Sequence, residues 1–185
     1  MKLLCISPSA YGFVRNNIVP LPSETTLYEK FKDFTVKPGF NDLSLEFLKK
    51  LVPLMNQGEE FATIMIDEMK VDEWAEMDNK IDAVIGPHKY ANVVLVKSIT
   101  GKWELPVYTK FDSAITKKNL FKIIRKLEEI GVKIMFVVCD QGPRNLTLAK
   151  KLGINTESVS FPNPCDESRE ICFAFDWVHC FKNLR

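Results

Sequence analysis

The sequence predicts an α/β protein in which a mixed β-sheet carries helices on both faces and follows a small helical segment. Three observations support this fold class. Residues 1–58 place apolar side chains at helical spacing, residues 61–111 contain three successive strand-like stretches, and residues 117–185 alternate between helix-like and strand-like patterns. Successive strands followed by alternating helices and strands are typical of a mixed sheet on which helices pack.

The composition indicates a globular intracellular protein. The 185 residues are enough for one domain, or for one domain with an appendage, and 46% of them are apolar. No apolar run reaches the length of about 18 residues that a membrane span requires, and the first apolar stretch is too short for a signal peptide. Five cysteines without a CxxC pair indicate reduced thiols. We therefore expect a protein that is neither secreted nor inserted in a membrane.

The net charge of +1 conceals an uneven distribution. Residues 59–82 contain nine acidic and two basic side chains, whereas residues 97–151 contain twelve basic and five acidic ones. A polyanion-binding protein with an acidic metal site would show this pattern, and so would a protein with unevenly charged surface helices. Charge alone favours the second explanation.

The first 58 residues are predicted to be helical. Ser23 in LPSETTLYEKF is placed as an N-cap, and Glu24 in the first turn favours the positive end of the helix dipole. In NDLSLEFLKKLVPLMNQG the apolar residues keep helical spacing up to Gly58, and Pro53 predicts a kink or an early end. This segment is interpreted as a small helical subdomain.

From residue 61 the apolar pattern becomes that of strands. FATIMID is one candidate strand, and YANVVLVKSITGKWELPVYTKF is predicted to form two strands joined by a turn at residues 100–102. The clearest helix of the chain is TKKNLFKIIRKLEEIGV, which has one apolar stripe and Gly131 just past its end.

The C-terminal part is predicted to alternate between strands and helices. The apolar strand KIMFVVCD is followed by a helix that begins near Pro143 and ends at Gly153. A polar loop at residues 154–170 then precedes ICFAFDWVHCFKNLR, which predicts a short strand and the start of another helix. This order of elements matches the ribonuclease-H-like fold.

Two of the predicted strands end in an aspartate. Asp67 follows FATIMI and Asp140 follows KIMFVVC. The first and fourth strands are neighbours in a ribonuclease-H-like sheet, so these carboxylates would face each other and could share divalent cations. Mg²⁺ and Mn²⁺ prefer such oxygen ligands, and a pair of ions about 3.5–4 Å apart can promote phosphoryl transfer. An acid at a strand end is also common as a structural cap, and that alternative stays open.

Several segments resemble the P-element-type transposases, the group that includes the THAP-domain transposases. The segments are IDEMKV at Asp67, GKWELPVYTKF, VVCDQGPRNLTLAKKLGI at Asp140 and FDWVHCFKNLR, in the order expected of that family. The N-terminal SPSAYGFVRNNIVPLPSETTLYEKFKDF is similar to the helical segment before the family's catalytic domain. The resemblance implies a helical segment at residues 1–58 and, at residues 59–185, a ribonuclease-H-like domain that cuts and joins DNA.

The resemblance also assigns roles to residues. It implies that Asp67 and Asp140 belong to a catalytic acidic triad that binds Mg²⁺ or Mn²⁺. Glu68, which follows the first acid, is better explained as a solvated neighbour than as a ligand. Asp176 and His179 in the motif DWVH either lie near the site or orient the next helix, and both alternatives stay open.

The family carries its third acid far downstream, beyond a nucleotide-binding insertion. The printed sequence reaches Arg185 where that insertion is expected to begin, so residues 59–185 would lack the insertion and the third acid. Because catalysis depends on accurate placement of the reacting groups, we expect the chain alone to be weak or inactive. No GxxxxGK[ST] loop is present, so no GTP site is expected. The alternative is a domesticated DNA-binding or protein-interaction module that has lost catalysis.

DNA is the partner that the resemblance implies, with self-association into a homo-oligomer left open and no membrane partner. Lys117, Lys118 and Lys122 lie on the predicted solvent face of the clearest helix, and Arg144 begins the helix after Asp140. These side chains could neutralise DNA phosphates, or they could form an ordinary solvated surface. A DNA-acting protein of this family is expected in the nucleus or elsewhere inside the cell.

Overall fold

The computed structural model describes residues 7–31, 38–71, 76–78 and 83–183. The chain divides into two compact units, Met1–Val36 and Lys37–Arg185. Within the described residues, every helix is too short or too polar to span a membrane. The cysteines of the described part are free thiols, as the sequence predicted: Cys139, Cys165, Cys172 and Cys180.

Among its described residues, the first unit has the helices α2 (Pro8–Asn17) and α3 (Glu24–Phe31). Tyr11 of α2 is buried and donates its hydroxyl hydrogen to the carbonyl oxygen of Pro22 at 2.7 Å, which ties α2 to the start of α3. The hydroxyl oxygen of Ser23 accepts a hydrogen bond from the backbone N–H of Thr26 at 3.0 Å. Ser23 is therefore the N-cap of α3, as predicted.

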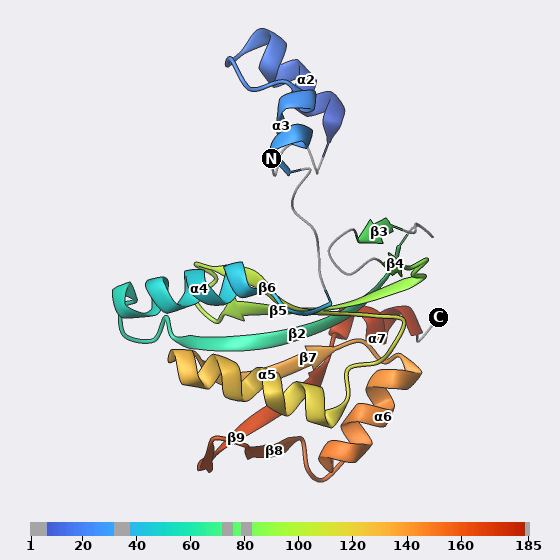
Figure 1. Cartoon of the computed structure of the whole chain (residues 1–185). Coiled ribbons are helices and arrows are strands. Elements are labelled where there is room, and N and C mark those ends of the chain that lie inside the picture. The colour runs from blue at the N-terminus through green and yellow to red at the C-terminus, as the bar shows by residue number, and fades with distance from the viewer. Residues whose placement is uncertain (1–6, 32–37, 72–75, 79–82, 184–185) are drawn as a thin grey trace. The chain divides into compact units, whose positions relative to one another are not determined.

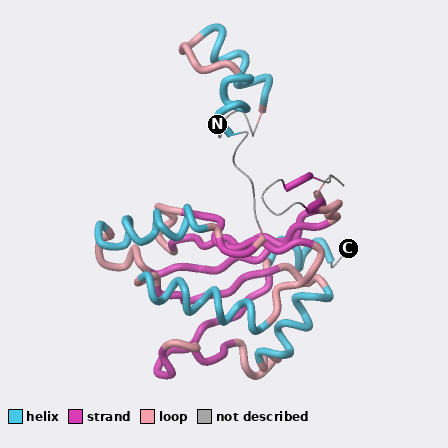
Figure 2. Tube along the Cα trace, in the orientation of Figure 1, coloured by secondary structure: helices cyan, strands magenta, loops and turns pink. Residues whose placement is uncertain are grey.

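The second unit is built on a seven-stranded sheet with the strand order β1-β6-β5-β2-β7-β9-β8 (Figures 1 and 2). The strands are β1 (Gly39–Phe40), β2 (Phe61–Lys70), β5 (Tyr90–Ser98), β6 (Glu104–Phe111), β7 (Lys133–Cys139), β8 (Ser160–Asn163) and β9 (Asp166–Phe175). β2, β7 and β9 are parallel, and the other neighbours are antiparallel. The sheet is therefore mixed, with β2 and β7 adjacent, which confirms the predicted ribonuclease-H-like fold class. A separate pair consists of β3 (Glu76–Asp78) and β4 (Ala83–Ile85).

The helices of this unit are α4 (Asp42–Leu51), α5 (Lys117–Ile130), α6 (Pro143–Leu152) and α7 (Trp177–Asn183), with a short 3-10 turn after α4 (Val52–Leu54). α4, α5 and α6 contribute side chains such as Leu48, Ile123 and Leu148 to one core, where they meet Ile64 and Val137 of the sheet. Because side chains alternate along a strand, these sheet residues lie on a single face. The three helices cover that face; within the described residues, none of the buried core side chains comes from α7.

The sequence features of α5 predicted its limits. Thr116 and Asn119 form a capping box at the start, and Gly131 ends the helix with a left-handed φ of 104° that favours glycine. The apolar stripe is fully buried, as expected: Leu120, Ile123, Ile124 and Leu127. α5 therefore anchors the core of the unit.

Two predicted segments are divided differently in the structure. The first compact unit ends at Val36, and α4, within the predicted helical segment 1–58, packs in the second unit through the buried Leu45 and Leu48. The predicted polar loop at 154–170 contains β8 and the first half of β9, which form an antiparallel pair. Its pattern was missed because only Phe161 is apolar in β8 and the buried partner on the same strand is polar Asn163.

Candidate active site

Asp67 and Asp140 follow two residues that are partners in the sheet. Ile66 of β2 pairs in parallel with Cys139 of β7, and neighbouring strands lie about 4.8 Å apart. The two aspartates therefore leave the paired region at the same level. Asp67 does not end its strand as predicted, since β2 continues to Lys70 by pairing with β5. What ends at Asp67 is the contact between β2 and β7.

Asp176 occupies the equivalent position on the next strand. Phe175 of β9 also pairs with Cys139, and the backbone N–H of Asp176 donates to the carbonyl oxygen of Cys139 at 2.8 Å. The Asp176 carboxylate accepts from the backbone N–H of Val178 at 3.0 Å, a contact that orients the start of α7. His179 lies in α7, and its side chain lies outside the described part of the chain.

The Asp140 carboxylate is held by the turn that follows it. Its Oδ1 accepts hydrogen bonds from the backbone N–H of Gly142 at 2.9 Å and from Nδ2 of Asn145 at 2.6 Å. A Cβ on Gly142 would lie 3.0 Å from Oδ1, so a side chain there would press on the carboxylate. Burial, together with the negative charge of Asp140, raises the pKa of the Cys139 thiol to about 12. Cys139 is thus a neutral, buried thiol of the core.

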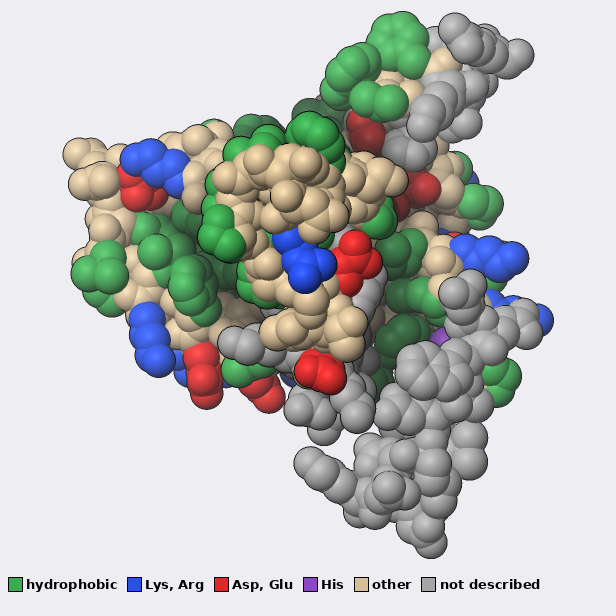
Figure 3. Space-filling view, turned by 90° about the horizontal axis from the view of Figure 1, so that it is seen from above, with side chains coloured by type: hydrophobic (Ala, Val, Ile, Leu, Met, Phe, Trp, Pro, Cys, Tyr) green, Lys and Arg blue, Asp and Glu red, His purple; other side chains and the backbone are tan. Residues whose placement is uncertain are grey.

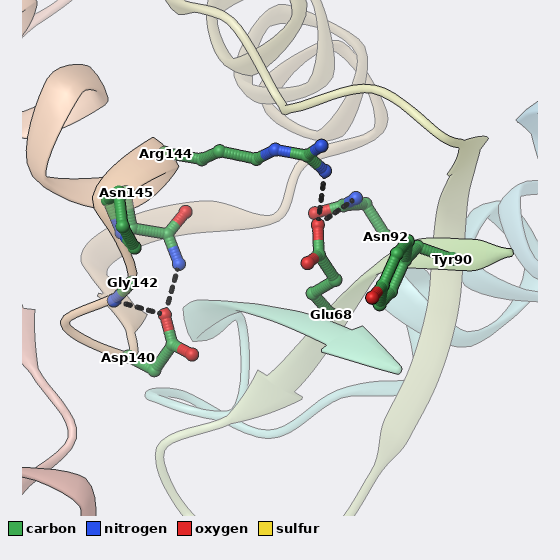
Figure 4. A pocket seen from close by; sticks show the side chains of 8 residues that line it. Glu68, Tyr90, Asn92, Asp140, Gly142, Arg144 and Asn145 are labelled. Carbon is green, nitrogen blue, oxygen red and sulfur yellow. Dashed lines mark hydrogen bonds and ion pairs between the residues drawn. The ribbon is translucent and has the colours of Figure 1, made fainter. Parts of the chain in front are cut away.

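A pocket of about 300 Å³ lies beside Asp140 (Figure 4). It is lined by Glu68, Tyr90, Asn92, Asp140, Gly142, Pro143, Arg144 and Asn145. Asp67 is not among the lining residues, because successive side chains of a strand point to opposite faces and Glu68 takes the side of the pocket. The structure therefore brings Glu68 and Asp140 to one pocket, and places Asp67 beside Asp140 only by strand register.

Glu68 accepts hydrogen bonds from two neighbours and stays partly exposed to solvent. Its Oε2 accepts from NH1 of Arg144 at 2.6 Å and from Nδ2 of Asn92 at 2.9 Å. Its side chain is 31% exposed, against 47% for Arg144. Figure 4 shows the Arg144 side chain reaching from α6 across the pocket to Glu68.

The acidic residues suit a hard divalent cation in part. Two carboxylates with retained waters are a common Mg²⁺ arrangement, and oxygen donors are the right type for Mg²⁺ or Mn²⁺. Among the described residues, no group of three or more His, Cys, Asp or Glu side chains is arranged to hold a metal. Within the described part, the pairing of Ile66 with Cys139 relates Asp67 to Asp140 by register alone, and of these two carboxylates only Asp140 lines the pocket.

Three of the four basic residues singled out from the sequence are exposed on α5. Lys117 donates to the carbonyl oxygen of Lys151 at 3.2 Å, and Nζ of Lys122 lies 5.4 Å from the ring centre of Phe40. Lys118 is also exposed. On the face drawn in Figure 3, basic and acidic side chains are interspersed, with no single large basic area. Lys117, Lys118 and Lys122 are thus individually exposed.

Sequence reasoning missed two amide side chains of the pocket. Asn92 is 4% exposed and occupies an inward position of a strand whose other inward residues include Val94 and Val96. A polar residue at such a position indicates a buried hydrogen-bond partner, and this signal could have identified it. Asn145 had only a weak signal, its place in the first turn of the helix after Asp140.

The strand order and the helices on the sheet define a ribonuclease-H-like domain. Residues 36–153 match the family model described as TNP-like, RNase H N-terminal domain. The chain belongs to this family.

Two curated relatives and a solved structure confirm the resemblance. The chain is 30% identical over 178 residues to the transposable element P transposase of Drosophila melanogaster, covering 96% of this chain and 23% of that protein. It is 26% identical over 205 residues to the DNA transposase THAP9 of Homo sapiens, covering 98% and 22%. The Drosophila P element transposase strand transfer complex matches with a TM-score of 0.76 and 29% identity, covering 98% of this chain and 41% of that chain. The chain thus spans less than a quarter of the curated relatives' length.

Proposed function

We propose that this chain is the ribonuclease-H-like part of a DNA transposase of the two-metal cleavage and strand-transfer type. The observation that carries the proposal is the pairing of Ile66 with Cys139, which brings Asp67 and Asp140 to the same level on adjacent strands. The similarity to the Drosophila and human transposases supports the choice of DNA as substrate. Two carboxylates alone hold the metals loosely, so the activity of the isolated chain is expected to be weak or absent.

The roles of the acidic residues follow from their contacts. Asp67 and Asp140 would hold Mg²⁺ or Mn²⁺ through carboxylate oxygens. Such ions activate the attacking oxygen and stabilise the leaving oxygen of an in-line displacement. Gly142 and Asn145 bind Oδ1 of Asp140, which fixes the direction in which its other oxygen is presented.

The basic residues would position the DNA. Lys117 and Lys118 lie in the first turn of α5, and Lys122 lies about one turn further on. α5 follows β6, which ends on the same side of the sheet as the carboxyl end of β2, where Asp67 lies. Arg144 lies near Asp140, but its NH1 already donates to the Glu68 carboxylate. A contact of Arg144 with DNA would therefore compete with the Glu68–Arg144 ion pair. Phosphate contacts of this kind are independent of sequence and weaken as salt rises. The nucleus, or another place where DNA is available inside the cell, is the proposed site of action.

A Mn²⁺ titration tests the proposal. We expect the unmodified chain to bind Mn²⁺, and Asp67→Asn and Asp140→Asn each to weaken binding by at least about tenfold, because each removes a charged oxygen ligand. Asp42→Asn, which changes an exposed aspartate in the first turn of α4, is the matched control and should leave the affinity unchanged. Equal binding by all four proteins would rule out the paired aspartates as the metal site.

The second candidate is a DNA-binding or protein-interaction module that has lost catalysis. It is favoured by the Asp140 carboxylate, which already accepts two hydrogen bonds from its own turn, as a purely structural cap would. This candidate predicts salt-dependent DNA binding that is the same with and without Mn²⁺. The transposase proposal instead predicts that Mn²⁺ tightens DNA binding and that Asp67→Asn abolishes this effect.

A further inference from the structure

We propose that the Glu68–Arg144 ion pair is a clamp that positions Asp140 for metal binding by fixing the first turn of α6 to β2. The inference rests on the proposed function, because it assigns two further residues to the same site. In this role Glu68 and Arg144 are positioning residues that act through Asp140.

The first turn of α6 is not held by the hydrophobic core. The buried residues of this helix all lie in its second half: Leu148, Ala149 and Leu152. In the first half, Pro143 and Arg144 are exposed, and Leu146 remains 41% exposed. A helix end without buried side chains opens easily, so the position of this turn depends on polar contacts.

The clamp supplies such a contact across a long sequence separation. Arg144 in the first turn donates from NH1 to Oε2 of Glu68 on β2 at 2.6 Å. Glu68 is itself fixed, because the buried Asn92 of β5 donates to the same oxygen at 2.9 Å. Glu68 and Asn92 are also register partners in the sheet. The turn is thereby tied to two strands of the rigid sheet.

Movement of this turn would be transmitted to Asp140. Both donors to Oδ1 of Asp140, the N–H of Gly142 and the amide of Asn145, belong to the turn that contains Arg144. If the clamp is absent, these donors can move with the helix end, and the carboxylate loses its fixed orientation relative to Asp67. Partners that orient a ligand from outside the coordination sphere typically change metal affinity by about 10–100-fold.

Charge and position make opposite predictions for Arg144. A positive guanidinium near an acidic site repels a cation, so charge alone predicts that Arg144→Gln tightens Mn²⁺ binding and Glu68→Gln weakens it. The clamp predicts that both substitutions weaken binding, because either one releases the turn. The sign of the Arg144→Gln effect therefore separates positioning from electrostatics.

The test is a thermodynamic cycle on the full chain. The variants are Glu68→Gln, Arg144→Gln, their double mutant and the exchanged pair Glu68→Arg with Arg144→Glu. We expect each single variant to weaken Mn²⁺ binding about tenfold, the double mutant to be no weaker than the singles, and the exchanged pair to recover most of the affinity. Asn92 can support the exchanged pair, because its amide can rotate to present its oxygen to an arginine.

Hydrogen exchange in the metal-free protein gives a second measurement. The backbone N–H groups of Asn145 and Leu146 both donate to the carbonyl oxygen of Gly142, at 2.9 and 3.0 Å. The exchange rates of these two amides should rise at least several-fold in both single variants. In the exchanged pair, the rates should fall back to those of the unmodified chain. This measurement needs neither metal nor activity.

Glu60 and Lys133 provide the matched control. They form an ion pair at 3.6 Å that links the starts of β2 and β7. This ion pair lies at the opposite ends of these strands from Glu68 and Asp140. Glu60→Gln and Lys133→Gln remove the same charges and should leave both Mn²⁺ affinity and exchange of residues 142–146 unchanged.

Two results would overturn the clamp: unchanged or tighter Mn²⁺ binding by Arg144→Gln, and an exchanged pair that behaves like the double mutant. Failure of the unmodified chain to bind Mn²⁺ would instead overturn the proposed function. In that case unchanged exchange of the Asn145 and Leu146 amides in the single variants would overturn the clamp as well.

Discussion

Ile66 and Cys139 are partners in the parallel pair of β2 and β7, and an aspartate follows each of them. The chain then takes different paths. β2 continues as a strand, whereas the chain after β7 turns into α6, and the Asp140 carboxylate accepts the N–H two residues further on, at Gly142. One aspartate thus stands on a regular strand and the other on a turn. The geometry of the pair therefore depends on how firmly the turn is held.

Gly142→Ala should disturb the metal site without unfolding the protein. The φ of Gly142 is −59°, which alanine adopts easily, but the new Cβ would lie 3.0 Å from Oδ1 of Asp140. The carboxylate must shift by a few tenths of an ångström and lose part of its contact with the turn. We expect Mn²⁺ affinity to fall several-fold, measured by calorimetric titration.

The control for this substitution is Gly12→Ala in α2. No atom lies within 4 Å of the position of its Cβ, and alanine in a helix interior is favoured over glycine by about 0.5–1 kcal/mol. This variant should bind Mn²⁺ as the unmodified chain does. Unchanged affinity in Gly142→Ala would show that the contact at Asp140 has no influence on the site.

Asp112 should make the stability depend on pH in the acid range. The His88 ring, followed by the backbone N–H groups of Lys89 and Tyr90, lowers the pKa of Asp112 from 3.8 to about 2. Between these values the unfolded chain binds more protons than the folded chain, so the stabilisation is complete above about pH 4 and is lost as pH falls toward 2.

Asp112→Asn tests this dependence, because asparagine tolerates the left-handed φ of 50° at this position. In urea titrations, the unfolding free energy of the unmodified chain should fall more steeply between pH 4 and pH 2 than that of the variant. Asp42→Asn, on the exposed start of α4, should follow the unmodified chain. Parallel curves for Asp112→Asn and the unmodified chain would contradict the role given to His88.

The order of the main elements could be predicted because their signals are local. The apolar stripe, capping box and terminal glycine of α5 all lie within the helix and its flanks. β8 escaped prediction because its stability is not local. Its buried Asn163 depends on Glu128, 35 residues earlier in the sequence, for a hydrogen bond of 2.9 Å. The place of α4 escaped for the same reason, since its partners on β6 and α5 lie far along the chain.

The candidate site was predictable only in part. Asp67 and Asp140 stand out because each follows an apolar run that the sheet register then aligns. The partners of Glu68 were not visible, since Asn92 and Arg144 are separated from it by 24 and 76 residues. A contact between neighbouring strands requires the register, and a contact with a helix end also requires the helix position. The sequence pattern specifies neither.

Glu128 should be important for stability. Its side chain is 10% exposed and accepts from NH2 of Arg169 at 2.5 Å, from Nδ2 of Asn163 and from the backbone N–H of Ile134. Glu128→Ala removes the acceptor of the buried Asn163 amide and Ile134 N–H and one of the two ion-pair partners of Arg169, so we expect a loss of roughly 3 kcal/mol in the free energy of unfolding.

The neighbouring Glu129 is the control for Glu128. It is 66% exposed, and within the described part of the chain it forms an ion pair with the surface side chain of Lys126 at 3.7 Å. Glu129→Ala should change the free energy of unfolding by less than about 0.5 kcal/mol, because exposed ion pairs contribute little. Equal losses for both variants in denaturant titrations would mean that the link from α5 to the β8–β9 hairpin does not stabilise the fold.

The position of the domain boundary can be tested by truncation. Residues 37–185 retain α4, whose Leu45 and Leu48 fill the core beside α5 and β6, whereas residues 59–185 lack α4 and β1. Each buried leucine contributes about 2–5 kcal/mol, so their joint removal approaches the whole stability of a typical domain. We expect fragment 37–185 to unfold cooperatively near the melting temperature of the full chain, and fragment 59–185 to aggregate or to unfold without a cooperative transition in circular dichroism. Equal cooperative melting of both fragments would instead support the boundary at residues 58 and 59 that the sequence pattern predicted.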